Sequence, residues 1–98
     1  VNAENAYNGS GLTPTLYRYL KQAGVDGITL GDHIYKKSDI IKTLQESTCI
    51  VKPANYPDEA PGASFGVLPI GNENFLAIVS VMGRTFMRHV DCPFQAID

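Results

Sequence analysis

The sequence lacks the features that mark membrane, nucleic-acid-binding and disulfide-stabilised proteins. No apolar run approaches the roughly 20 residues that a membrane-spanning helix needs. The formal net charge is −2, and no basic cluster suits nucleic acid or an anionic membrane. The two cysteines, Cys49 and Cys92, form no C-x-x-C pair, which favours reduced thiols over a disulfide, the alternative. We therefore expect a cytoplasmic protein that binds neither a membrane nor a long nucleic acid.

Several catalytic signatures are also absent. The chain contains no G-x-x-x-x-G-K-[ST] phosphate loop and no G-x-S-x-G nucleophile elbow. His33 and His89 share neither H-x-x-x-H nor H-E-x-x-H spacing, so no two-histidine zinc helix is predicted. The sequence therefore gives no motif for a P-loop nucleotide hydrolase, a serine hydrolase of the elbow type or a two-histidine zinc protease, and any site must be built from residues without such a motif.

The composition is that of an ordinary folded domain. Hydrophobic residues make up 44% of the 98 residues and charged residues 18%. This length suits one small domain, residues 1–98. Because the chain opens on Val1 and on loop-like residues, we expect it to be a fragment of a larger domain.

The first half of the chain alternates predicted helices with predicted strands. Thr13 and Pro14 form a helix start, and Gly24 is a helix stop, which predicts a helix over 14–23. Its expected apolar stripe is Leu16, Tyr19, Leu20 and Ala23. Short buried strands are predicted over 25–30 and 49–51, with a second helix capped by Ser38 between them. This order predicts an α/β fold.

The second half predicts a loop followed by a hairpin. Residues 53–64 are rich in proline and should form a loop. Strands are expected over 64–70 and 74–81, joined by a turn at Gly71-Asn72. The second of them is almost wholly apolar, as expected for a strand buried on both faces.

Candidate site residues follow the first predicted strand. Gly31 permits a sharp turn, after which Asp32 and His33 offer an oxygen and an imidazole for a metal or a phosphate. Ligands bind at this edge of open α/β sheets. Arg84, at a later strand end, is a candidate anion contact, with a solvent-facing role as the alternative. Asn55 is a candidate rim residue, with a self-packed loop as the alternative.

Five separated blocks resemble bacterial metallophosphoesterases of the YmdB-like subfamily, which are calcineurin-like phosphodiesterases associated with 2′,3′-cyclic nucleotides. The blocks occur in the same order along nearly the whole chain. They are Asn2-Ala3-Glu4-Asn5 with Gly9–Pro14, Gly24–Asp26 with Ile28–His33, Pro53–Pro57, Gly83–Met87 and Asp91–Phe94.

The resemblance implies a metal-dependent phosphodiesterase with an α/β/β/α sandwich in the intact protein. Two divalent metal ions, such as Fe or Mn, would activate the water that attacks the phosphoester of a small substrate such as a cyclic nucleotide. Glu4 would bridge the metals, with Asn5 beside it in the metal group. Asp32 stands where the family has a metal-binding asparagine. His33 matches the catalytic histidine that assists the leaving group.

Two departures from the family pattern bear on activity. Asp32 adds a negative charge, which should lower the Lewis acidity of the metals or change metal preference. The opening Gly-Asp block of the family and its later histidine ligands are missing, so the isolated chain is expected to be catalytically incomplete and to bind no metal or fewer metals. The alternative function is a truncated, non-catalytic α/β domain that binds a ligand or forms a homo-oligomer through its exposed edges.

Overall fold

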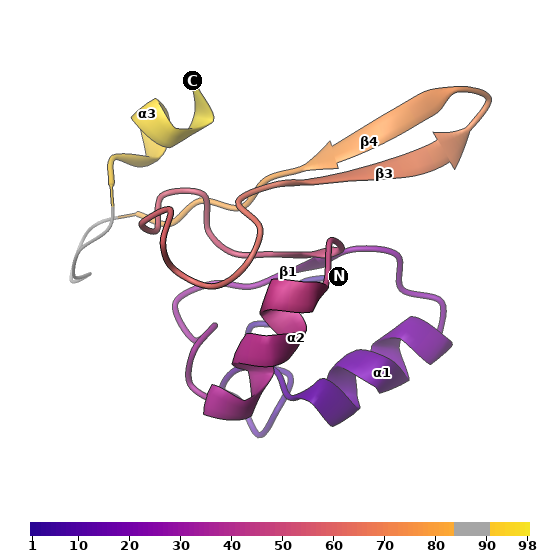
Figure 1. Cartoon of the computed structure of the whole chain (residues 1–98), viewed down its shortest axis with the longest axis vertical. Coiled ribbons are helices and arrows are strands. Elements are labelled where there is room, and N and C mark those ends of the chain that lie inside the picture. The colour runs from indigo at the N-terminus through magenta and orange to yellow at the C-terminus, as the bar shows by residue number, and fades with distance from the viewer. Residues whose placement is uncertain (84–90) are drawn as a thin grey trace.

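The computed structural model describes residues 1–83 and 91–98, and it has the predicted α/β character. In chain order the elements are α1 (Pro14–Gln22), β1 (Ile28–Thr29), the 3₁₀ helix η1 (Ser38–Ile40), α2 (Ile41–Glu46), β2 (Ile50–Val51), β3 (Gly66–Gly71), β4 (Asn74–Ile78) and α3 (Pro93–Ile97). In Figure 1, α1 and α2 lie beside β1, while the β3–β4 hairpin projects away from them. None of the helices in the described part of the chain has the length and apolar character required to cross a bilayer.

A small set of parallel backbone segments organises the first half of the fold. β1 pairs in parallel with β2, with Ile28 opposite Ile50 and Thr29 opposite Val51. On the other side of β1, Asn2 forms a parallel bridge with Thr29. Residues 1–3, β1 and β2 therefore run in the same direction, and the chain leaves all three at the same edge.

The apolar core lies around these segments. It consists of buried side chains from the N-terminal segment, both short strands and the second helical region: Ala3, Leu12, Ile28, Leu30, Ile34, Ile40, Leu44 and Ile50. Helix α1 begins as predicted, since the Thr13 hydroxyl accepts a hydrogen bond from the Leu16 N–H at 3.3 Å. It ends before Gly24, which adopts a φ of +97° that favours glycine.

The helix predictions need three corrections. Tyr19 is 67% exposed, and Tyr17 packs against the core in its place. Ser38 is the first residue of η1 and not a cap, because Lys37 occupies the cap position without a side-chain hydrogen bond. A third short helix, α3, was not predicted; Pro93 opens it, which is the position where proline suits a helix best.

The β3–β4 hairpin forms, but its turn and its burial differ from the prediction. The turn residues are Asn72 and Glu73, with φ values of 48° and 64°, instead of Gly71 and Asn72, and β4 ends at Ile78 and not at residue 81. In β4, Phe75 is 66% exposed, so the expectation of a strand buried on both faces is wrong for the described residues. The hairpin contacts the rest of the fold through Leu68 and Ile78, whose side chains pack over Gly27.

A buried lysine ties down the proline-rich loop. Lys52 follows β2 and is only 1% exposed. Its ammonium group donates to three carbonyl oxygens, those of Pro57 at 2.9 Å, Asp58 at 3.3 Å and Ala60 at 3.0 Å. Since an ammonium has three N–H donors, each of them has a partner here. The loop is thus ordered around an internal cation, without any regular secondary structure.

Replacing this cation should destabilise the fold. Lys52→Met keeps the aliphatic stem but leaves three inward-facing carbonyl oxygens unpaired, which should cost about 1–3 kcal/mol of unfolding free energy. Urea denaturation measures the loss. Lys42→Met, an exposed change on α2, serves as the control and should have little effect. Equal stability of the Lys52 and Lys42 variants would contradict the structural role of the ammonium group.

Candidate functional site

Polar side chains meet where residues 1–3 and β1 end. Two backbone hydrogen bonds join these segments: the Thr29 N–H donates to the Val1 carbonyl at 2.9 Å, and the Ala3 N–H donates to the Thr29 carbonyl at 3.0 Å. Glu4 follows the first segment, and Asp32 and His33 follow the second. Because the two segments are parallel neighbours, these side chains emerge at one edge, as predicted for ligand sites in α/β folds.

The three side chains are close enough to act together. One potential ligand atom from each of Glu4, Asp32 and His33 lies within 4.8 Å of the others. Glu4 and Asp32 border a cleft of about 410 Å³ whose described lining is Asn2, Glu4, Leu30, Gly31, Asp32 and Ser80–Gly83, and His33 follows directly after this lining. A larger hollow, of about 560 Å³ near α3, includes none of the three, so the smaller cleft is the one that the candidate site residues border.

Gly31 makes room for the Glu4 carboxyl group. A Cβ atom at Gly31 would lie 2.5 Å from the Glu4 Cδ and Oε1 atoms and 2.6 Å from Oε2. The carboxyl group therefore sits directly over the glycine backbone, and any side chain at this position would displace it. The turn glycine predicted from the sequence thus also opens space for the neighbouring acid.

The two carboxyl groups perturb one another. The pKa of Glu4 is raised, chiefly by its side-chain hydrogen bond to Asp32 and then by burial and by the Asp32 charge. The pKa of Asp32 is lowered, chiefly by the same hydrogen bond. Of the two carboxyl groups, Glu4 is therefore the one that takes up a proton more readily and Asp32 the one that ionises more readily.

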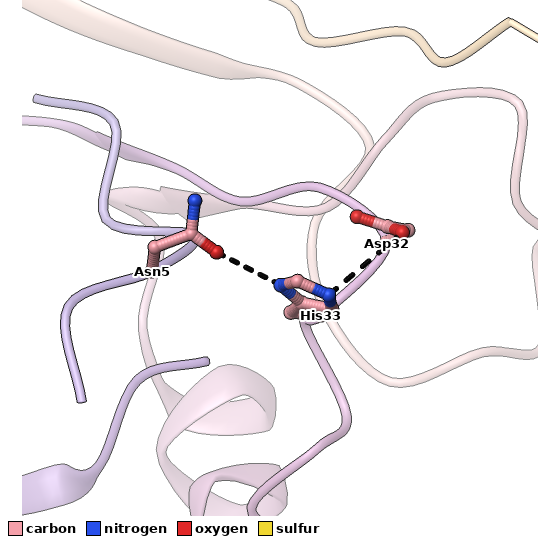
Figure 2. A network of polar contacts seen from close by, with 3 residues as sticks. All are labelled: Asn5, Asp32 and His33. Atoms are coloured by element: carbon pink, nitrogen blue, oxygen red, sulfur yellow. Dashed lines mark hydrogen bonds and ion pairs between the residues drawn. The ribbon is translucent and has the colours of Figure 1, made fainter. Parts of the chain in front are cut away.

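His33 lies between Asn5 and Asp32 (Figure 2). Its Nδ1 is 2.8 Å from the Asn5 Oδ1, and its Nε2 is 4.0 Å from the Asp32 Oδ2. The imidazole and the Asp32 carboxylate are 33% and 45% exposed, so the second contact is a solvated ion pair at most. The structure brings together all four residues of the predicted metal and catalytic group.

A tyrosine pair borders the carboxylates. The pKa of Tyr56 is raised by burial and then by the charges of Asp32 and Glu4. Its ring lies 5.8 Å from that of Tyr35, and the Tyr35 hydroxyl donates to the Pro61 carbonyl at 2.6 Å. Burial raises the pKa of Tyr35 to about 12. Tyr56 follows Asn55, the predicted rim residue, and its pKa is the one affected by the charges of Asp32 and Glu4.

Asn55 does not occupy the predicted rim position, because it is fully buried. Its amide nitrogen donates to the carbonyls of Met82 at 2.7 Å and Asp91 at 3.1 Å, and its Oδ1 accepts from the Met82 N–H at 2.9 Å. Both amide N–H groups are used, so Asn55 holds two chain segments together. Arg84 lies outside the described residues.

Sequence reasoning missed one part of the cleft wall. Residues 80–83 line it because Pro53 forms a parallel bridge with Ser80 and the Ala54 N–H donates to the Ser80 carbonyl at 2.7 Å. The Ser80 hydroxyl also donates to the Leu30 carbonyl at 3.3 Å, across a separation of 50 residues. Only the pairing of distant segments reveals this neighbour, and no local pattern carries that information.

Comparison with known proteins identifies the family. The family model described as YmdB-like protein matches residues 1–98. The chain belongs to the YmdB-like protein family. Within the curated proteins, it is 38% identical over 98 residues to a 2′,3′-cyclic-nucleotide 2′-phosphodiesterase of Bacillus subtilis. The match covers 100% of this chain and 37% of the Bacillus protein, so the chain spans well under half of that relative.

Solved structures of similar proteins support the YmdB-like fold. A hypothetical protein from Thermus thermophilus matches with a TM-score of 0.88 and 45% identity, over 99% of this chain and 38% of that one. A phosphatase from Mycoplasma pneumoniae matches with a TM-score of 0.85 and 29% identity, over 99% and 36% of the two chains. The arrangement of elements is therefore shared with a phosphatase fold.

The carboxyl pair in this YmdB-like chain makes a direct prediction. Asp32→Asn removes both the charge and the charge-assisted hydrogen bond that favour protonated Glu4, so the Glu4 pKa should fall toward its ordinary value. A ¹³C NMR titration of side-chain carboxyl groups measures the midpoint. Asp39→Asn, at the exposed start of η1, should leave that midpoint unchanged. An unaltered Glu4 midpoint in Asp32→Asn would show that the two carboxyl groups are not coupled.

Proposed function

We propose that this chain forms part of a metal-dependent phosphodiesterase that acts on small phosphodiesters, including 2′,3′-cyclic nucleotides. The observation that carries the proposal is the convergence of Glu4, Asp32 and His33 within 4.8 Å at the edge of a cleft. The substrate class is taken from the activity named for the Bacillus relative. The match to the Bacillus relative includes the whole chain, so it includes Glu4, Asp32 and His33.

The donor set fits divalent metal ions such as Mn²⁺ or Fe²⁺. Carboxylate oxygens together with an imidazole suit these ions. Two adjacent carboxyl groups are also an arrangement that a cation stabilises, because its charge offsets their mutual repulsion. When bound, the metals would polarise the phosphoryl group and activate a water molecule. Glu4 and Asp32 would hold them.

The residues of this chain then have separate tasks. The Glu4 carboxylate, at the centre of the group and seated over Gly31, is suited to bridging between cations. Asp32 contributes an oxygen on the cleft side. The imidazole of His33 is suited to donating a hydrogen bond or a proton to the departing oxygen of the phosphoester. The open cleft beside them, of about 410 Å³, has room for a nucleotide-sized phosphodiester.

Two carboxylate ligands are too few for two metal ions, so we propose that further ligands come from parts of the protein that this chain does not include. The 37% coverage of the Bacillus relative is consistent with that division. A non-catalytic role in ligand binding or self-association is the second candidate function. It is favoured by the exposed apolar side chains of the hairpin, among them Ile70 at 61% and Phe75 at 66%.

Hydrolysis is tested on the longest product of the encoding gene and on the 98-residue chain. With Mn²⁺ or Fe²⁺, the long product should hydrolyse 2′,3′-cyclic AMP and bis-p-nitrophenyl phosphate, while the isolated chain should be inactive. His33→Ala in the long product should lower turnover by roughly 10²–10⁴-fold, the usual contribution of a general acid. An inactive long product under metal-replete conditions would favour the non-catalytic function.

Metal binding is tested separately from turnover. In calorimetry of the long product, Glu4→Gln should lower Mn²⁺ affinity by tenfold or more, on the order expected for metal-site residues. Gly31→Ala should lower it about tenfold, because its Cβ displaces the Glu4 carboxyl group. Gly83 lines the same cleft, and a Cβ atom there would meet no atom of the described residues within 4 Å, so Gly83→Ala is the matched control. Full Mn²⁺ affinity in Glu4→Gln would refute the ligand role.

A further inference from the structure

Asn5 contacts the imidazole of His33 through one defined atom. The Asn5 Oδ1 lies 2.8 Å from the His33 Nδ1, as the dashed line in Figure 2 marks. An amide carbonyl oxygen can only accept a hydrogen bond. With Oδ1 as its partner, this contact is a hydrogen bond only when Nδ1 carries the proton, and Nε2 is then the ring nitrogen that faces Asp32.

The loop that carries Asn5 is fastened to the segment that carries His33. Inside the loop, the Gly11 N–H donates to the Glu4 carbonyl at 2.6 Å, and the Tyr7 N–H donates to the Gly11 carbonyl at 3.0 Å. Gly11 has a φ of +85°, and a Cβ atom there would lie 3.0 Å from the His33 carbonyl oxygen. The backbones of the two segments thus touch next to the Asn5–His33 contact.

A second contact joins this loop to the segment after His33, between Tyr7 and Lys37. The Lys37 ammonium lies 4.9 Å from the centroid of the Tyr7 ring, within the range of a cation–π interaction. The segment after His33 is therefore held to the loop at Gly11 and at Tyr7. This fastening fixes the position of Asn5 even though its side chain is exposed.

The contact has a chemical consequence for the histidine. The proton of a free neutral histidine side chain prefers Nε2, and in proteins the partner of one ring nitrogen decides which nitrogen carries it. Here the acceptor at Nδ1 reverses that preference and turns the ring so that Nε2 faces the carboxylates. A histidine without this partner would present a different nitrogen at a less defined angle.

We propose that Asn5 is a positioning residue that sets the tautomer and the orientation of His33, and that it is not a metal ligand. The tautomer assignment rests on the 2.8 Å contact between the Asn5 Oδ1 and the His33 Nδ1 and does not depend on the proposed function. Its importance for hydrolysis rests on the proposed function: with Nδ1–H held by Asn5, Nε2 is the nitrogen left to face the substrate, and it donates to the departing oxygen when the ring is in its imidazolium form. The assignment replaces the metal-ligand role that the family resemblance implies for Asn5.

The tautomer is measured directly by ¹H–¹⁵N NMR of imidazole nitrogens in the metal-free 98-residue chain, at about pH 8, above the usual histidine pKa of about 6.5. His33→Gln identifies the His33 signals by their loss. The unmodified chain should show the Nδ1–H form as the main species. Asn5→Ala should make Nε2–H the main species, and Asn5→Leu should do the same while keeping the side-chain volume.

Asn5→Asp keeps a carboxylate acceptor in place of the amide oxygen and should retain the Nδ1–H form. Asn8→Gly is the matched control in the same loop, because Asn8 has a φ of 50° that glycine adopts freely. It should leave the tautomer unchanged. An Nε2–H majority in the unmodified chain, or an unchanged tautomer in both Asn5→Ala and Asn5→Leu, would overturn the proposal.

The second half of the proposal is tested by Mn²⁺ binding to the long product. Asn5→Ala should bind Mn²⁺ with the affinity of the unmodified protein, whereas a loss as large as that of Glu4→Gln would make Asn5 a ligand and overturn the positioning role. Failure of hydrolysis in the unmodified protein would refute the proposed function and leave the tautomer result standing. The two proposals therefore fail independently.

Discussion

Two backbone hydrogen bonds bring residues 1–3 alongside β1, and the candidate site exists because of that pairing. The loop residue Glu4 lies far in sequence from the turn residues Asp32 and His33. Because the two segments are parallel, they end at the same edge, and the side chains that follow them lie close together. Loss of this pairing would separate the acids and remove the site, even with every site residue present.

The close approach of the Glu4 and Asp32 carboxyl groups has an electrostatic cost. Two carboxyl groups in contact repel when both are ionised, and the raised pKa of Glu4 together with the lowered pKa of Asp32 expresses that conflict. Gly31 allows the approach, since it has no Cβ to keep Glu4 away. Such crowded acids contribute little to folding at neutral pH. They are suited to holding cations, which is why the proposed function rests on them.

Much of the scaffold around the site is polar and has no role in the chemistry. Lys52 orders the proline-rich loop through three carbonyl oxygens, and Asn55 joins that loop to residues 82 and 91. Both side chains are buried with their N–H groups paired, so they stabilise the loop that carries Tyr56 toward the acids. A buried asparagine beside a site thus serves the structure, while the exposed Asn5 contacts the candidate catalytic histidine.

The sequence by itself determined the bounds of α1, the order of helices and strands in the first half of the chain, and the family. Thr13 and Gly24 bound α1 because capping depends on neighbouring residues, and the order of blocks around Glu4 and His33 identified the YmdB-like family. Tertiary structure alone decided burial and pairing. Tyr19 and Phe75 are exposed because exposure depends on which distant segments cover a face. The contact of Asn5 with His33 likewise required the fold, because it joins atoms that only backbone packing at Gly11 brings together.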